Sequence, residues 1–269
     1  MATVIRPFGE HLRDWRQRRR MSQLDMALEA DISARHLSFL ETGRAQPSRE
    51  MVLRLAEQLD APLRERNVLL LAAGFAPVFG ERSLEDPALA PAMAAVREWL
   101  TAHEPYPALA LDRRWNLIAA NGAVWPLLEG VAPELLRPPV NTLRLALHPN
   151  GLAPRIVNFA EWRTHLLDRL RRQAQMGGDP ELTALTVELA AYPGGETRLH
   201  AGRIEAPEVL TPLVLRAGDA VLSLIGTVTV FGTPLDVTLS ELMLETLLPA
   251  DAATRAWFAE QKGPTPASS

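Results

Sequence analysis

Three serines, Ser22, Ser33 and Ser48, each stand directly before a short run with helical apolar spacing, and this crowding of helix N-caps strongly limits the fold. Ser22 is followed three residues later by Asp25, the pattern of a capping box. Asp31 lies between the first two runs, and Asp tolerates a positive φ better than most residues other than glycine. We therefore predict two short helices joined by a sharp turn, the helix-turn-helix arrangement.

The flanking sequence extends this motif to five short helices within about 75 residues. Periodicity predicts a first helix over about 6–20 and a fifth after Pro62, and Gly43 is placed to end the third. The predicted inward stripes of the second, third and fourth helices are Leu24, Ala27 and Leu28, then Leu37 and Leu40, then Met51, Val52, Leu55, Ala56 and Leu59. Such a segment is a compact all-α bundle.

The outer face of the third helix carries side chains that a merely solvated helix would not select. Ala34 and Phe39 are apolar, and Arg35 and Ser38 lie beside them. Phe39 packing on a neighbouring helix is one interpretation; we favour DNA reading, in which arginine takes guanine and apolar groups meet thymine methyls. The predicted DNA-binding residues, including flanking groups for phosphates, are Gln23, Ser33, Ala34, Arg35, Ser38, Phe39, Arg44 and Arg49.

The stretch "LRDWRQRRRMSQLDMALEADISARHLSFLETGRAQPS" resembles the lambda-repressor-like, XRE-type helix-turn-helix family, and the resemblance covers residues 8–73. The family usually has glycine where this chain has Asp31. The resemblance implies that Arg16 in the first helix pairs with Glu41 late in the third, fixing the recognition helix on the bundle. It also implies a homodimer on double-stranded DNA with a pseudo-palindromic operator.

Composition narrows the classes of function that fit the chain. The 269 residues include no cysteine, which excludes disulfides and thiolate metal sites. Residues 1–74 carry 12 arginines and 10 acidic residues, whereas 75–269 carry 16 basic and 22 acidic residues, so no general nucleic-acid coat is expected. The chain has neither a signal-peptide pattern nor an apolar run long enough for a bilayer, so we expect a cytoplasmic protein without a membrane partner.

A second domain is predicted after a Gly- and Pro-containing boundary at 74–87. The predicted division is a DNA-binding domain over 1–75, a linker and connecting helix over 76–94, a second domain over 95–261 and a disordered tail over 262–269; no role is assigned to 194–207. The elements expected in the second domain are strands at 108–111 and 115–120, a helix capped by Asn121, helices at 159–177 and 182–192, strands over 209–231 and 234–249, and a terminal helix. The hairpin turn is expected at Ala217-Gly218-Asp219.

The segments "LDRRWNLIAANGAVWPLL", "NFAEWRTHLLDRLRRQA" and "LPADAATRAWF" resemble the ligand-binding domain of MmyB-like regulators, a PAS-like antiparallel sheet with helices. The expected fold class is therefore α+β. The resemblance implies a small, largely apolar ligand, with a fatty acid as the example. The predicted ligand-binding residues are Trp115, Asn121, Trp125, Phe159, Trp162 and Arg163, with Arg144 as a second candidate anchor. The alternative for such aromatic stripes is an ordinary core.

No constellation for catalysis, metal or cofactor binding is recognised. The six histidines are scattered, and phosphate-binding glycine motifs are absent. Glu241 and Glu245 share one face of a predicted strand, but exposed strand glutamates are commoner than acid–base pairs. The leading hypothesis is a ligand-responsive transcription regulator, more often a repressor. The alternatives are an enzyme with an autoregulatory DNA-binding head and a regulator whose second domain only dimerises or binds a protein.

Overall fold

A computed structural model describes residues 6–194 and 210–261; the tail predicted to be disordered, 262–269, and most of 194–207 lie outside the described residues. The described chain forms two compact units. One comprises residues 6–83 together with 175–177 and 232–240, and the other comprises 84–174, 178–194, 210–231 and 241–261. The connection between the last two strands of the chain is therefore part of the first unit.

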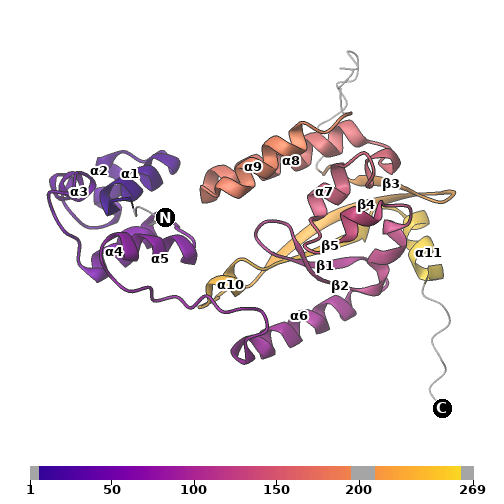
Figure 1. The fold of residues 1–269 in the computed structure, drawn as a ribbon, viewed down its shortest axis with the longest axis horizontal. Coiled ribbons are helices and arrows are strands. Elements are labelled where there is room, and N and C mark those ends of the chain that lie inside the picture. Colours follow the sequence, from indigo (N-terminus) through magenta and orange to yellow (C-terminus); the bar gives the residue numbers. More distant parts are fainter. Residues whose placement is uncertain (1–5, 195–209, 262–269) are drawn as a thin grey trace. The chain divides into compact units, whose positions relative to one another are not determined.

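Five helices make up most of the first unit (Figure 1): α1 (Phe8–Arg18), α2 (Gln23–Glu29), α3 (Ala34–Glu41), α4 (Arg49–Gln58) and α5 (Leu63–Ala72). The three predicted serine caps are confirmed, because the hydroxyls of Ser22, Ser33 and Ser48 each accept from a backbone N–H of the following helix. Asp31 has a φ of 52°, which makes the tight turn between α2 and α3.

The predicted inward stripe of α2 is wrong at two of its three positions. Leu24 and Leu28 are 59% and 71% exposed, whereas Met26, Ala27 and Ala30 are buried. Apolar residues occupy both sides of this seven-residue helix, so periodicity alone does not choose between them. The inward residues of α3 and most of those of α4 are as predicted.

The second unit contains a five-stranded antiparallel sheet. Its strands are β1 (Ala108–Leu111), β2 (Leu117–Ala120), β3 (Leu213–Ala217), β4 (Ala220–Val230) and β5 (Met243–Pro249), in the order β2-β1-β5-β4-β3. The hairpin between β3 and β4 turns at Gly218-Asp219, where Gly218 has a φ of 58°. These features confirm the α+β class and the predicted hairpin.

Helices cover both faces of this sheet (Figure 1). Helix α6 (Ala90–Ala102) packs on one face, and α7 (Thr142–Leu147), α8 (Phe159–Gly177) and α9 (Pro180–Ala190) lie over the other. Side chains alternate along β1: Leu109 and Leu111 join the core under α8, whereas Ala108 and Ala110 pack towards α6. Helix α11 (Ala252–Gln261) packs against β4 and β5.

Several short helices complete the described fold. They are 3₁₀ turns at Pro87–Leu89, Gly122–Leu128, Pro133–Leu136 and Ala153–Arg155, together with the single α-turn α10 (Val237–Ser240). The strand predicted over 234–249 is therefore wrong in its first half, where α10 precedes β5. Asp236 begins α10 by accepting from the Thr238 N–H, which competes with strand pairing.

The α10 turn is bound within the first unit by polar contacts. The Asp236 carboxylate pairs with the Arg82 guanidinium at 2.8 Å, and Val237 N–H donates to the Gly80 carbonyl at 2.7 Å. The Thr238 hydroxyl also donates to the Arg82 carbonyl at 2.6 Å. Because Val237 is fully buried, this connection is an integral part of the unit that contains the helix-turn-helix.

Candidate functional site

The recognition helix candidate, α3, is fixed at its last residue by a cluster of polar side chains. Glu41 accepts from Arg16 at 2.6 and 3.1 Å and from the Gln23 amide at 2.8 Å, which confirms the predicted Arg16–Glu41 pair. Arg13 also approaches at 3.5 Å. Burial alone would raise the pKa of Glu41, but the hydrogen bonds from Arg16 and Gln23 outweigh it and lower that pKa. The buried Glu41 carboxylate of α3 therefore links this helix to α1 through Arg16 and to α2 through Gln23.

Helix α1 approaches the end of α3 unusually closely, and Gly9 makes this possible. A Cβ atom at Gly9 would lie 2.5 Å from the carbonyl oxygens of Leu40 and Glu41. A side chain at this position would force the two helices apart. Close packing and the Glu41 cluster together hold α3 rigidly in the bundle.

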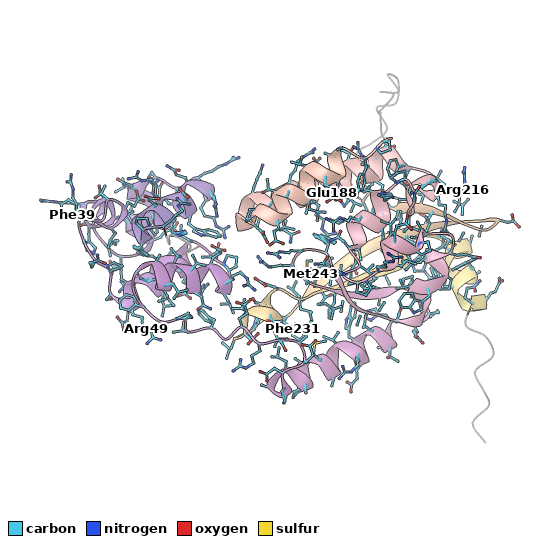
Figure 2. All side chains as sticks on the ribbon, viewed as in Figure 1. Phe39, Arg49, Glu188, Arg216, Phe231 and Met243 are labelled. Carbon is cyan, nitrogen blue, oxygen red and sulfur yellow. The ribbon has the colours of Figure 1, made fainter. Side chains whose placement is uncertain are left out.

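The outer face of α3 has the predicted character at Arg35 and, in part, at Ser38 and Phe39. Arg35 is exposed, and its guanidinium lies 5.3 Å from the centre of the Phe39 ring. Phe39, which Figure 2 labels, is partly exposed. Ser38 is partly buried beside them, whereas Ala34 packs partly against the helical core. Arg35 and Phe39 therefore form a paired, solvent-facing surface one helical turn long.

The flanking candidates differ in how free their side chains are. Arg44 and Arg49 are exposed around the loop between α3 and α4 (Figure 2 labels Arg49). Ser33 uses its hydroxyl to cap α3 by accepting from His36 N–H at 3.1 Å. Gln23 uses its amide nitrogen to reach Glu41, which leaves its carbonyl oxygen for another partner. A rigid helix with exposed arginines beside it suits the major groove and its phosphates.

An apolar cavity of about 100 Å³ lies in the second unit, between the sheet and its helices. The sheet contributes side chains from β1, β2, β3 and β5: Leu109, Leu117, Leu213, Leu215, Glu245 and Leu247. The covering elements contribute Val124, Leu127, Thr142, Leu143, Leu145, Trp162 and Leu166. Most of these side chains are leucines, so the cavity suits an apolar molecule.

Trp115 forms one wall and is held firmly. Its backbone has a φ of 68°, its indole Nε1 donates to the Gln173 side chain at 2.9 Å, and its ring is 2% exposed. The Arg169 guanidinium lies 4.4 Å from the ring centre. A positive φ in a bulky residue is strained and survives only where its surroundings fix it. This wall of the cavity is therefore preformed.

Two of the sequence-predicted ligand residues line the cavity, namely Trp115 and Trp162. Phe159 packs against the same core but is not in the lining. Trp125 is 56% exposed and lies in a separate surface groove beside β2.

The predicted polar anchors form hydrogen bonds within the fold, although Arg163 Nε is buried without a partner among the described residues. Asn121 accepts from Ala108 N–H and donates to the Leu100 and Tyr106 carbonyls. It stands at the predicted N-cap position of the following helix, but its side chain makes no capping hydrogen bond. Arg163 donates to the carbonyls of Ala190 and Tyr192.

Arg144, the second candidate anchor, pairs with Glu188 through two hydrogen bonds of 2.7 Å. Glu188, which Figure 2 labels, is on α9, and Arg144 is on α7. These arginines fasten helices to one another, and their side chains do not line the cavity.

Glu245 is the cavity residue that sequence reasoning missed, because a strand glutamate was expected to be exposed. Its side chain is 15% exposed and lines the cavity, with Arg169 3.5 Å away. Burial raises the pKa of Glu245. A signal was available: Met243 and Leu247, two residues to either side on the same strand face, are apolar.

Comparison with protein families identifies both parts of the chain. Residues 92–260 match the model of the MmyB-like transcription regulator ligand binding domain, which spans more than half of the chain. The chain belongs to this family. Residues 7–69 of this MmyB-like regulator match a helix-turn-helix domain, so the protein is a DNA-binding transcription regulator with a ligand-binding domain. No similar protein was found among curated proteins.

Two further findings concern residues 6–194 and 210–261. No helix there combines the length and the apolar character needed to cross a bilayer. In the same residues, no three His, Cys, Asp or Glu side chains gather as they would around a metal ion.

Proposed function

We propose that this MmyB-like regulator is a repressor that binds a pseudo-palindromic operator as a homodimer and responds to a small apolar ligand. Helix α3 would enter the major groove, with Arg35 contacting guanine and Phe39 a thymine methyl. Arg44 and Arg49 would hold phosphates on either side of the groove. The second unit would bind the ligand without transforming it.

The observation that carries the DNA-binding part is the pairing of a rigidly held α3 with an exposed outer face. Glu41 fixes the helix through Arg16 and Gln23, whereas Arg35 and Phe39 stay on the surface. A side chain that reads bases needs this combination, because a mobile helix would lose part of its contact energy as ordering entropy. Ser33, Ala34 and Ser38 would then act mainly by shaping the contact surface.

The cavity supports the ligand-responsive part. An apolar space lined by Trp115 and Trp162 suits a fatty acid or another molecule with an apolar body. The strand order β2-β1-β5-β4-β3 supports the PAS-like description of this unit. A second domain that served only for dimerisation would not need an apolar cavity.

The test of base reading is selection of operator DNA from random sequences, followed by binding of the Arg35→Ala variant. We expect the variant to lose about 1–3 kcal/mol on the selected site and little on random DNA. Arg255→Ala, on α11, is the matched control. Equal affinity of the Arg35→Ala variant and the unchanged protein for the selected site would remove Arg35 from the reading set.

The homodimer and the ligand are tested together by native mass spectrometry of the purified protein. A dimer that releases a discrete small molecule on mild denaturation supports both parts of the proposal. A monomer at the concentrations used for operator binding would contradict the palindromic-operator model.

A further inference from the structure

One hydrogen-bond donor in the cavity wall has no partner among the described residues, and it is the indole Nε1 of Trp162. Trp162 is 8% exposed and lines the cavity. An unpaired buried N–H is unfavourable. The other two polar side chains of the wall that carry a donor are used: Trp115 donates to Gln173 at 2.9 Å and Thr142 donates to the Trp115 carbonyl at 3.2 Å.

The acid in the same wall restricts which ligands fit. Glu245 stands on β5 between apolar cross-strand neighbours, Leu109 on β1 and Val228 on β4. The charged side chain that faces Glu245 is Arg169 of α8, and the two side chains lie 3.5 Å apart. Arg169 stacks on the Trp115 ring and does not line the cavity. An ionised carboxylate in so small a space would meet Glu245 as a like charge, unless one of the two acids took up a proton.

We propose that the cavity binds an apolar molecule whose polar end is uncharged and accepts a hydrogen bond from Trp162 Nε1. Alcohols, ketones, esters and protonated carboxylic acids have this chemistry. The inference rests on the proposed ligand-binding role of the second unit and narrows its ligand. A fatty acid would enter as the neutral acid rather than as the carboxylate.

The size of the cavity guides the choice of probes. Its volume of about 100 Å³ is of the order of engineered apolar cavities that hold benzene. Short chains should therefore bind without rearrangement, and longer chains would need the covering helices to yield. Matched hexyl and decyl series of alcohol, methyl ester and carboxylate separate the effect of length from that of charge.

The experiment is calorimetric titration of the full-length chain with both series at neutral pH, without DNA. We expect the alcohol and the ester of one chain length to bind at least about tenfold more tightly than the carboxylate of that length. The affinity of the carboxylic acid should increase as the pH is lowered towards the pKa of the free acid, whereas that of the alcohol should change less.

Two variants assign the effect to the two side chains. Trp162→Phe keeps an aromatic ring but removes the N–H donor of the indole. The affinity for the alcohol should therefore decrease about tenfold. Trp99→Phe, in the core on the α6 side of the sheet, is the matched control and should lose little. Glu245→Gln should bring the affinity for the carboxylate closer to the affinity for the alcohol of the same length.

Three outcomes would overturn the inference in distinguishable ways. Carboxylate binding as tight as that of the alcohol would contradict the uncharged polar end while leaving ligand binding intact. Equal losses in the Trp162→Phe and Trp99→Phe variants would contradict the role of Nε1. If no member of either series binds, the sensor part of the proposed function falls as well, whereas operator binding by α3 would be unaffected.

Discussion

At the scale of single residues, Glu41 is the side chain on which the position of the recognition helix most depends. It is buried and accepts from Arg16, Gln23 and Arg13. Removing one partner of such a pair leaves the other charge uncompensated, which is more damaging than losing an exposed ion pair. We expect Glu41→Gln to destabilise the first unit by about 3 kcal/mol.

The measurement for Glu41→Gln is urea unfolding. The signal is hydrogen exchange of the α3 backbone amides, because it reports the stability of the first unit alone. Asp14→Asn is the control, because the Arg6–Asp14 pair is largely exposed, and it should cost less than about 1 kcal/mol. Equal costs for the two variants would mean that the Glu41 cluster contributes no more than a surface pair.

The pH dependence of the same carboxylate gives an independent prediction. The pKa of Glu41 is lowered in the folded protein from an ordinary value of 4.5. Its contribution to stability is therefore fully present above about pH 4.5 and is lost as the pH falls through the lower folded pKa. Between neutral pH and the acid limit, the stability of the first unit should decrease less in the Glu41→Gln variant than in the unchanged protein. Parallel curves would contradict this assignment.

At the scale of elements, Asn121 joins three segments that the sequence left separate. Its carbonyl accepts from Ala108 N–H at the start of β1, and its amide donates to Leu100 at the end of α6 and to Tyr106 in the loop between them. An aspartate here would lose both donors and leave two buried carbonyls without this partner. We expect Asn121→Asp to destabilise the second unit by about 2 kcal/mol or more.

Urea unfolding of the second unit tests this structural role of Asn121. Asn150→Asp, on an exposed loop, is the matched control. If Asn121 acts structurally, the folded variant should keep its affinity for the cavity ligand. Loss of ligand affinity at unchanged stability would instead support the ligand-anchor role predicted from the sequence.

The features that could be predicted from the sequence are those fixed by interactions between residues close together in the chain. The caps at Ser22, Ser33 and Ser48 and the turn at Gly218 depend on neighbouring residues, and all were predicted correctly. The Arg16–Glu41 pair came from the family resemblance and is confirmed. These features assign most of the DNA-binding candidates to α3 and its flanking loops from the sequence alone.

The errors arose where long-range packing decides. Periodicity did not choose the buried side of α2, where Leu24 and Leu28 are exposed, because apolar residues occupy both of its sides. Asn121 and Arg163 looked like ligand anchors, but the Asn121 amide and one terminal nitrogen of Arg163 donate to carbonyls far away in sequence. Glu245 was assigned to solvent because nothing local indicates that helices cover that face of β5. A cavity is a property of packing, so its polar groups were the least predictable part.

At the scale of the whole molecule, the proposed ligand response requires that a ligand in the cavity change DNA binding by α3. The connection between β4 and β5 bears on it directly. Asp236 and Val237 in this connection are fixed to Arg82 and Gly80 within the first unit, and Glu245 of the cavity wall follows nine residues after Asp236 on the same continuous chain. A ligand that moves β5 would therefore pull on a segment that is bound in the helix-turn-helix unit.

The variant that isolates this connection is Asp236→Asn, since asparagine can still cap α10 by accepting from Thr238 N–H but loses its charge attraction to Arg82. Asp86→Asn is the matched control, because Asp86 caps a short helix in the second unit.

Coupling between two sites is measured as the change in operator affinity caused by saturating ligand, typically about 1–3 kcal/mol. We expect Asp236→Asn to reduce that change while operator affinity without ligand and ligand affinity without DNA stay close to those of the control. If the full ligand effect persists, coupling passes instead through another link between the two units. These links are the chain that leads from residue 83 into α6 and the end of α8, whose residues 175–177 belong to the first unit.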